Sequence, residues 1–417
     1  MRETYLRKYA KLIVKVGINL KKEQEVVITA ALDQPHFIEL LVEECYKLGA
    51  SKVTVEWSHQ PITMLGVNNR SLESLSTVET WEREKLAHRA STLPAMIHIL
   101  SEDPDGLDGM DQQKNAAARS ARYQQLKKYY DDMDNKYQWC IAAVPGEAWA
   151  QKVFPGIGKR KAMEKLWRAI LYTCRITDEN GRPLSPIKEW KKHNEGLAAR
   201  CEHLNNLQIR SLRYSASNGT DLVVGMMDDG VFAGGVSKTI ARRPRNIWYN
   251  PNLPTEEVFT TPKRGCADGI VYSSKPLSYC GETIENFSIR FEGGKAVEAR
   301  AEKGEEALRA MLATDEGAAY LGECALVPQD SPICKSGITF INTLFDENAA
   351  CHLALGSGFC ECVRNYESYT IDECRARGVN DSAIHVDFMI GTPDLSITAV
   401  CADGSEVQIF KDGNWAF

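Results

Sequence analysis

The run from Ala383 to Gly391 places an imidazole and a carboxylate two residues apart, at His385 and Asp387. Apolar and polar side chains alternate along this run, which predicts a half-buried β-strand. On a strand, residues i and i+2 point to the same face, so His385 and Asp387 would lie side by side. This pair suits a divalent metal such as Zn²⁺, Mn²⁺ or Co²⁺. An isolated His-x-Asp pair is also common as a structural hydrogen bond, so a metal site needs further ligands.

Two candidate ligands occur upstream in the second half of the chain. Glu323 is a single carboxylate between apolar neighbours, and a buried carboxylate needs a partner, which a metal can provide. His352 follows Asn348 by four residues in a stretch that predicts a helix from Asn348 to Leu355, with both side chains on one face. A core histidine is an equally good interpretation of His352.

Two adjacent carboxylates, Glu256 and Glu257, follow Pro254 and Thr255. In an extended segment their side chains diverge, so one can bind a metal while the other faces elsewhere. The alternative is a charged turn at the start of a helix.

Composition narrows the class of protein. The chain has 417 residues and a net charge of −6, which allows two or three domains and lacks the basic footprint of a nucleic-acid-binding protein. The N-terminal residues lack the apolar stretch of a signal peptide, and no apolar run is long enough to span a membrane. The 13 cysteines are scattered without a CxxC pair, which favours reduced thiols in a cytoplasmic protein.

The first half of the chain alternates strands with helices. Short apolar runs predict strands at 25–31, 52–57, 95–100 and 139–144. Helical spacing or charged runs predict helices at 5–16, 35–49, 71–89, 112–133 and 160–174. This alternation predicts an open parallel-sheet α/β domain over residues 1–200. No glycine-rich phosphate motif is present, so no nucleotide cofactor is predicted.

The pattern changes after a polar helix predicted at 187–207. Strands separated by turn residues are predicted at 207–215, 220–226, 269–274, 288–292, 296–301, 396–401 and 406–410, with a helix at 305–313. Residues 201–417 therefore predict a mixed, largely antiparallel α+β domain that carries the catalytic site.

Four sequence blocks, in this order, resemble the thermophilic-type metalloaminopeptidases, the aminopeptidase T / aminopeptidase S family. They are Pro-Thr-Glu-Glu-Val-Phe-Thr at 254–260, Gly-Glu at 322–323, Asn-x-x-x-His-x-Ala-x-Gly at 348–356 and His-x-Asp-Phe-Met-Ile-Gly at 385–391. The resemblance covers most of the chain. It implies two divalent ions (Zn, Co or Mn) held by Glu257, Glu323, His352, His385 and Asp387. Glu323 is the candidate bridging ligand. It also implies a homodimer that acts on short peptides.

The chain departs from that family at one position. The family has a tyrosine seven residues after the ligand histidine, where it is thought to assist at the reacting carbonyl, and this position is Phe359 here. A phenyl ring cannot donate a hydrogen bond to a developing oxyanion. Losing one such donor costs on the order of 10²–10³ in rate if nothing replaces it. Tyr366, Tyr369 or a metal are candidate replacements.

These features predict a metal-dependent aminopeptidase that removes N-terminal residues from short peptides by means of a water activated by two metals. Glu256 is the candidate general base, and a purely structural ion pair is the alternative for it. Two other functions stay open: a metal-binding relative with lost or altered hydrolase activity, which Phe359 favours, and a hydrolase for another amide or ester. No nucleic acid or membrane partner is predicted.

Overall fold

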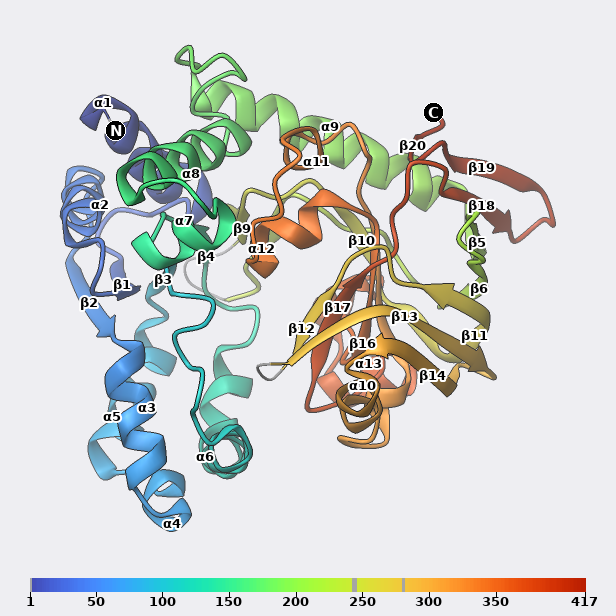
Figure 1. Cartoon of the computed structure of the whole chain (residues 1–417), viewed down its shortest axis with the longest axis horizontal. Coiled ribbons are helices and arrows are strands. Elements are labelled where there is room, and N and C mark those ends of the chain that lie inside the picture. Colours follow the sequence, from blue (N-terminus) through green and yellow to red (C-terminus); the bar gives the residue numbers. More distant parts are fainter. Residues whose placement is uncertain (1, 242–245, 280–281) are drawn as a thin grey trace. The chain divides into compact units, whose positions relative to one another are not determined.

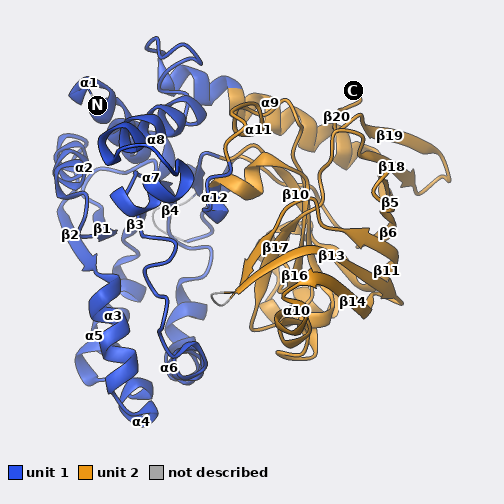
Figure 2. Cartoon of the chain, in the orientation of Figure 1, with its two compact units in different colours: residues 1–192, 236–254, 339–344 blue, residues 193–235, 255–338, 345–417 orange. Residues whose placement is uncertain are grey.

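The computed structural model describes residues 2–241, 246–279 and 282–417 (Figure 1). The chain divides into two compact units, each built from separate stretches of sequence (Figure 2). Unit 1 consists of Met1–Lys192, Val236–Pro254 and Thr339–Leu344. Unit 2 consists of His193–Gly235, Thr255–Ile338 and Phe345–Phe417.

Unit 1 is an α/β unit around a parallel sheet with the strand order β2-β1-β3-β4-β9. The strands are β1 (Glu25–Ala31), β2 (Lys52–Ser58), β3 (Ala95–Leu100), β4 (Trp139–Ala143) and β9 (Asn252–Leu253). The first four are the predicted strands. The open parallel-sheet fold expected from the alternating pattern is confirmed.

The helices of unit 1 follow the strands along the chain. They are α1 (Glu3–Leu12), α2 (Pro35–Lys47), α3 (Gln60–Asn69), α4 (Leu72–Ser76), α5 (Thr80–Thr92), α6 (Gln112–Met133), α7 (Glu147–Val153) and α8 (Lys159–Thr173), and α9 (Pro186–Asn206) continues into unit 2. The single helix predicted over 71–89 is wrong. Two helices, α4 and α5, occupy this stretch instead. The side chain of Ser71 accepts a hydrogen bond from the backbone N–H of Ser74 at the start of α4, and Glu79 forms a capping box with Glu82 at the start of α5.

Unit 2 contains a large antiparallel sheet with the order β12-β13-β11-β6-β5-β18-β19-β20, and β14 pairs with β13. Its strands are β5 (Ile209–Ser215), β6 (Asp221–Met226), β11 (Pro262–Tyr272), β12 (Leu277–Tyr279), β13 (Glu282–Glu292), β14 (Lys295–Lys303), β18 (Ser396–Cys401), β19 (Glu406–Lys411) and β20 (Asn414–Trp415). The predicted mixed, largely antiparallel character of this half is confirmed. Helix α10 (Glu305–Leu312) buries Leu308 and Met311 in the same core.

A second, smaller sheet of unit 2 carries the residues of interest. It is antiparallel, with the order β10-β15-β16-β17, formed by β10 (Val258–Thr260), β15 (Leu321–Leu326), β16 (His352–Gly356) and β17 (His385–Met389). The helix predicted over 348–355 is wrong. Helix α12 (Thr343–Asp346) and a short 3-10 turn, Glu347–Ala349, precede β16, and His352 begins the strand.

The two faces of the smaller sheet differ in chemistry. Apolar side chains from one face enter the main core of unit 2: Cys324, Leu326, Leu353, Leu355 and Phe388. The residues between them point to the other face, because side chains alternate along a strand. Glu323, His352, Ala354, His385 and Asp387 all lie on this second face.

Among the described residues, no helix is long and apolar enough to cross a membrane.

Candidate metal centre

Strand pairing lines up the polar face of the smaller sheet in rows. Glu323 of β15 pairs with Ala354 of β16, which pairs with Asp387 of β17. His352, two residues before Ala354 on β16, lies in the neighbouring row and is paired with Ala325 of β15. Small alanines thus alternate with the polar side chains. They leave room above the sheet between the carboxylates and the imidazoles.

The five predicted ligands form two groups that share one member. Ligand atoms of Glu257, Glu323 and His352 lie within 4.8 Å of one another, and so do those of Glu323, His385 and Asp387. Glu323 therefore belongs to both groups, and its role as a bridging ligand stays a prediction. Its side chain is 6% exposed.

Both histidines are held in the same way. The Nδ1–H group of His385 donates to the carbonyl of Ser357 (2.7 Å), and that of His352 donates to the carbonyl of Ala350 (3.1 Å). The Nε2 atom of each ring is thereby directed at carboxylates: His385 Nε2 lies 3.2 Å from Glu323 and 3.3 Å from Asp387, and His352 Nε2 lies 3.5 Å from Glu257. A histidine held through Nδ1 by a carbonyl is the usual arrangement of a metal ligand.

Glu256 and Glu257 diverge, as expected for an extended segment. The Glu257 carboxylate belongs to the first group, whereas Glu256 Oε2 lies 3.8 Å from Nε2 of His193 on helix α9. The backbone N–H of Glu256 donates to the side-chain oxygen of Asn348 (2.7 Å). This contact ties the glutamate segment to the turn that precedes β16.

Crowding of buried charges perturbs the pKa values of these groups. Burial, with the negative charges of Glu323 and Asp387, raises the pKa of Glu257 to about 7 against the opposing effect of His352. Burial disfavours a charge on His385, but Asp387 and Glu323 outweigh it and raise its pKa to about 11. Burial also opposes ionisation of Asp387, yet the neighbouring imidazoles hold its pKa below the ordinary value.

Glu347 was missed by the sequence reasoning. It lies in the turn before β16, where the side-chain N–H of Asn348 donates to it (3.3 Å). Burial and the charges of Glu257, Asp387 and Glu323 raise its pKa well above the ordinary value, so its carboxylate joins the same electrostatic cluster. Its proximity in sequence to His352 is the one local indication of a role, and a helix over 348–355 would pair Asn348 with His352 instead.

The donor set fits divalent cations. Three carboxylates, those of Glu257, Glu323 and Asp387, converge with two imidazoles, and this concentration of buried charge needs compensation. The contact of buried Asp387 Oδ1 is the ion pair with Nε2 of His385 at 3.3 Å. Oxygen and nitrogen donors of this kind suit Zn²⁺, Co²⁺ or Mn²⁺.

Phe359 lies against the second group. Its ring centroid is 4.9 Å from that of His385 and 5.5 Å from that of Phe259. Its backbone N–H donates to the hydroxyl of Thr261 (2.8 Å). The ring therefore occupies a fixed position beside a candidate ligand.

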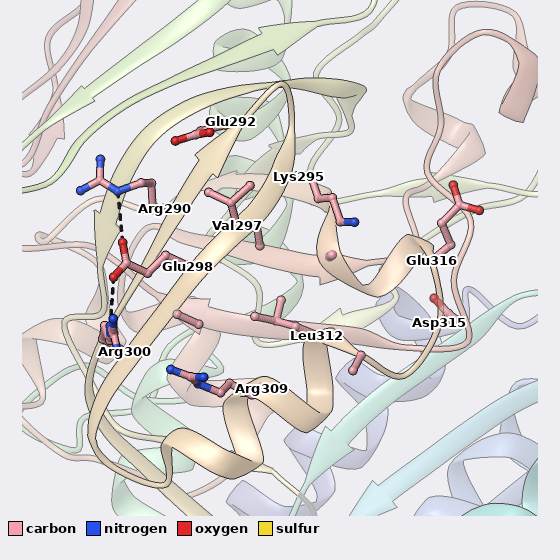
Figure 3. Close-up of a pocket in the computed structure, with 14 residues that line it drawn as sticks. Arg290, Glu292, Lys295, Val297, Glu298, Arg300, Arg309, Leu312, Asp315 and Glu316 are labelled. Atoms are coloured by element: carbon pink, nitrogen blue, oxygen red, sulfur yellow. Dashed lines mark hydrogen bonds and ion pairs between the residues drawn. The ribbon is translucent and has the colours of Figure 1, made fainter.

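A hollow elsewhere on unit 2 is a poor candidate for chemistry. Its lining comes from β13, β14, α10 and the residues after α10, and includes none of the predicted ligands. Figure 3 shows Glu298 between Arg290 and Arg300, with which it forms ion pairs of 3.5 and 3.0 Å. These charges largely satisfy one another.

Comparison with known proteins identifies relatives along almost the whole chain. The family described as thermophilic metalloprotease (M29) matches residues 2–415. Aminopeptidase AmpS of Bacillus subtilis is 40% identical over 99% of this chain and 98% of its own length. Aminopeptidase T of Thermus thermophilus is 39% identical over 98% of both chains. A solved structure, wild-type AmpT from Thermus thermophilus, superposes with a TM-score of 0.88 at 37% identity, covering 100% of both chains.

The resemblance inferred from the four sequence blocks is confirmed. A match along almost the full length, with relatives near 40% identity that are named aminopeptidases, shows that this chain belongs to the thermophilic metalloprotease (M29) family of metal-dependent peptide hydrolases.

Proposed function

We propose that the protein is an aminopeptidase that removes N-terminal residues from short peptides at a centre of two divalent ions. The observation that carries the proposal is the sharing of Glu323 by two groups of potential ligands. One shared carboxylate with separate partners on each side is the arrangement that a pair of neighbouring ions requires. The relatives named aminopeptidases support the choice of substrate.

The side chains have distinct roles in this proposal. Glu257 and His352 would hold one ion, His385 and Asp387 would hold the other, and Glu323, which belongs to both groups, would contribute to each. Glu347 belongs to neither group of ligand atoms, and in this proposal it adds negative charge beside both of them. Ions bound there would polarise the scissile carbonyl and make an attacking water more acidic. The carbonyls of Ser357 and Ala350 keep Nδ1 of each histidine protonated, so Nε2 is the atom that would lose its proton and offer a lone pair.

Replacement of the shared ligand tests the proposal. We expect Glu323→Gln to bind less metal and to lose at least 99% of peptide hydrolysis, because both groups lose a carboxylate. Metal content and release of free amino acid are measured on the same sample after reloading with Zn²⁺, Co²⁺ or Mn²⁺. Glu306→Gln, at an exposed position of α10, is the matched control. Normal metal content and turnover in Glu323→Gln would contradict the proposal.

Glu256 has two proposed roles that one variant separates. If Glu256 is the general base, Glu256→Gln would lower kcat about 10²–10⁴-fold while metal content stays normal. As a partner of His193, which its 3.8 Å separation supports, it would change kcat only slightly. The size of the kcat change decides between them.

A metal-binding protein with altered chemistry is the second candidate function, and Phe359 favours it. It predicts stoichiometric metal without release of amino acids from any peptide of a broad panel. The homodimer and the cytoplasmic location remain predictions, for which size measurement in solution and cell fractionation are the tests.

A further inference from the structure

We propose that Phe259 and Phe359 form the surface that receives the side chain of the substrate's N-terminal residue, and that this surface selects aromatic and large aliphatic residues. The inference rests on the proposed aminopeptidase function and names its substrate class. The two rings pack edge to face, with centroids 5.5 Å apart and an interplanar angle of 71°. We call them the aromatic pair.

The register of the smaller sheet brings the aromatic pair to the metal centre. Phe259 of β10 is paired with Ala325 of β15, which is paired with His352 of β16. Phe259 therefore lies in the row of His352, with only an alanine between them. Phe359 extends the pair to the other group, because its ring contacts that of His385 at 4.9 Å. The aromatic pair thus contacts the second group at His385, and its other ring lies in the strand row of His352 from the first group.

The segment that carries Phe359 is held from several sides. The N–H groups of Ser357, Gly358 and Phe359 donate to Ile384 O (2.7 Å), Asn380 O (2.9 Å) and Thr261 Oγ1 (2.8 Å). Buried Asn380 also donates through its side chain to the carbonyl of Gly356 (2.5 Å). A ring anchored in this way is pre-organised to contact a ligand rather than free to turn away.

Both rings are partly exposed, although most of the strand residues around them are buried. In a peptide, the side chain of the first residue is attached one carbon from the scissile carbonyl. If that carbonyl binds at the metal centre, the first side chain must contact the nearest surface. The aromatic pair offers that side chain an apolar surface without hydrogen-bonding groups. It favours phenylalanine or leucine over alanine and disfavours charged residues.

The test compares hydrolysis of Phe-Gly and Ala-Gly by the metal-loaded protein and its variants. We expect the ratio of kcat/KM values to fall about tenfold in both Phe259→Leu and Phe359→Leu, because each loses an aromatic contact with the substrate. Phe359→Tyr retains the ring and should retain the ratio. Phe417→Leu is the matched control, because Phe417 also contacts a histidine ring, that of His203 at 4.0 Å, and Trp415.

An unchanged ratio in both leucine variants would overturn the inference, and so would an equal fall in Phe417→Leu. A uniform loss for both substrates together with lost metal would show that the rings only support His385, which also overturns the inference.

If the unaltered protein hydrolyses neither peptide, the proposed function fails. In that case, calorimetry with free phenylalanine and free alanine tests whether the aromatic pair of the metal-loaded protein binds aromatic side chains. Tighter binding of phenylalanine that Phe359→Leu abolishes would support it, and equal binding would overturn it.

Discussion

In the proposed metal centre, His385 illustrates how a single candidate ligand is positioned by its neighbours. Its Nδ1–H group is held by a carbonyl, while two carboxylates face Nε2 and raise its pKa to about 11. The metal-free protein therefore carries a proton on the nitrogen that a metal needs. A ligand must lose its proton before it coordinates, so metal and proton compete for the same atom.

This competition predicts proton release and pH-dependent affinity. At pH 8, metal binding should release at least one proton, because His385 is protonated there. Glu257, with a pKa of about 7, is mostly ionised, whereas Glu347, whose pKa is raised well above the ordinary value, can add a further proton. Below pH 7, Glu257 is also protonated, so affinity should fall further as the pH is lowered. Calorimetry in buffers of different ionisation enthalpy measures the protons released. Enthalpies independent of buffer, with constant affinity from pH 6 to 8, would contradict the expectation.

Phe359 permits a prediction about rate. We expect Phe359→Tyr to raise kcat about tenfold or more, because a phenol beside His385 can donate to negative charge that develops on the carbonyl oxygen. Tyr366→Phe and Tyr369→Phe serve as comparisons, since these tyrosines are the other candidate donors. Steady-state kinetics on one peptide provide the measurement. An unchanged kcat would mean that the reaction needs no donor at this position.

At the scale of elements, the centre depends on three paired strands with small residues between the polar ones. Ala354 lies between Glu323 and Asp387, so a larger side chain there would project into the space among the ligands. We expect Ala354→Leu to fold and to lose metal binding. Ala402→Leu, in an exposed turn, should bind metal normally. Circular dichroism and metal content distinguish this result from general unfolding, and full metal occupancy in Ala354→Leu would show that the space is not needed.

The elements also explain what could be predicted from the sequence. The strands β1 to β4 of unit 1 and β17 were predictable because their apolar patterns are long or strictly alternating. His352 was placed on a helix because Ala-Ala-Cys-His-Leu-Ala-Leu is rich in helix-forming residues. Pairing with β15 and β17 overrides that preference. The alternation of His352, Ala354 and Gly356 with leucines was present, but local propensity concealed it.

Other features had no local signal. β15 contains a bulge between Leu321 and Glu323, and a Cβ atom at Gly322 would lie 2.2 Å from the carbonyl oxygen of Ser357. This close approach joins segments more than thirty residues apart. Glu347 likewise becomes relevant only when folding brings it to Glu257 and Asp387. Sequence patterns identify candidate side chains, whereas such contacts between distant segments depend on the complete fold.

At the scale of the molecule, the five predicted ligands and Glu347 all belong to unit 2. Their concentrated negative charge opposes folding unless cations balance it. We expect chelation to lower the melting temperature and added metal to restore it. A free-metal concentration 100 times Kd corresponds to about 2.7 kcal/mol of stabilisation per site. Thermal denaturation of dialysed protein measures this effect. Glu323→Gln should respond less, and a melting temperature that is insensitive to metal would contradict a buried cation centre.

The smaller sheet, with one apolar and one polar face, also disfavours incorrect strand pairing during folding. If β16 shifted by one residue against its neighbours, Leu353 and Leu355 would replace His352 and Ala354 on the polar face, and the imidazole would enter the apolar interior. Such a molecule would lose its core and its ligands together. Selection for a stable fold therefore also preserves the positions of the reactive groups, so a stably misregistered but inactive form is not expected to accumulate.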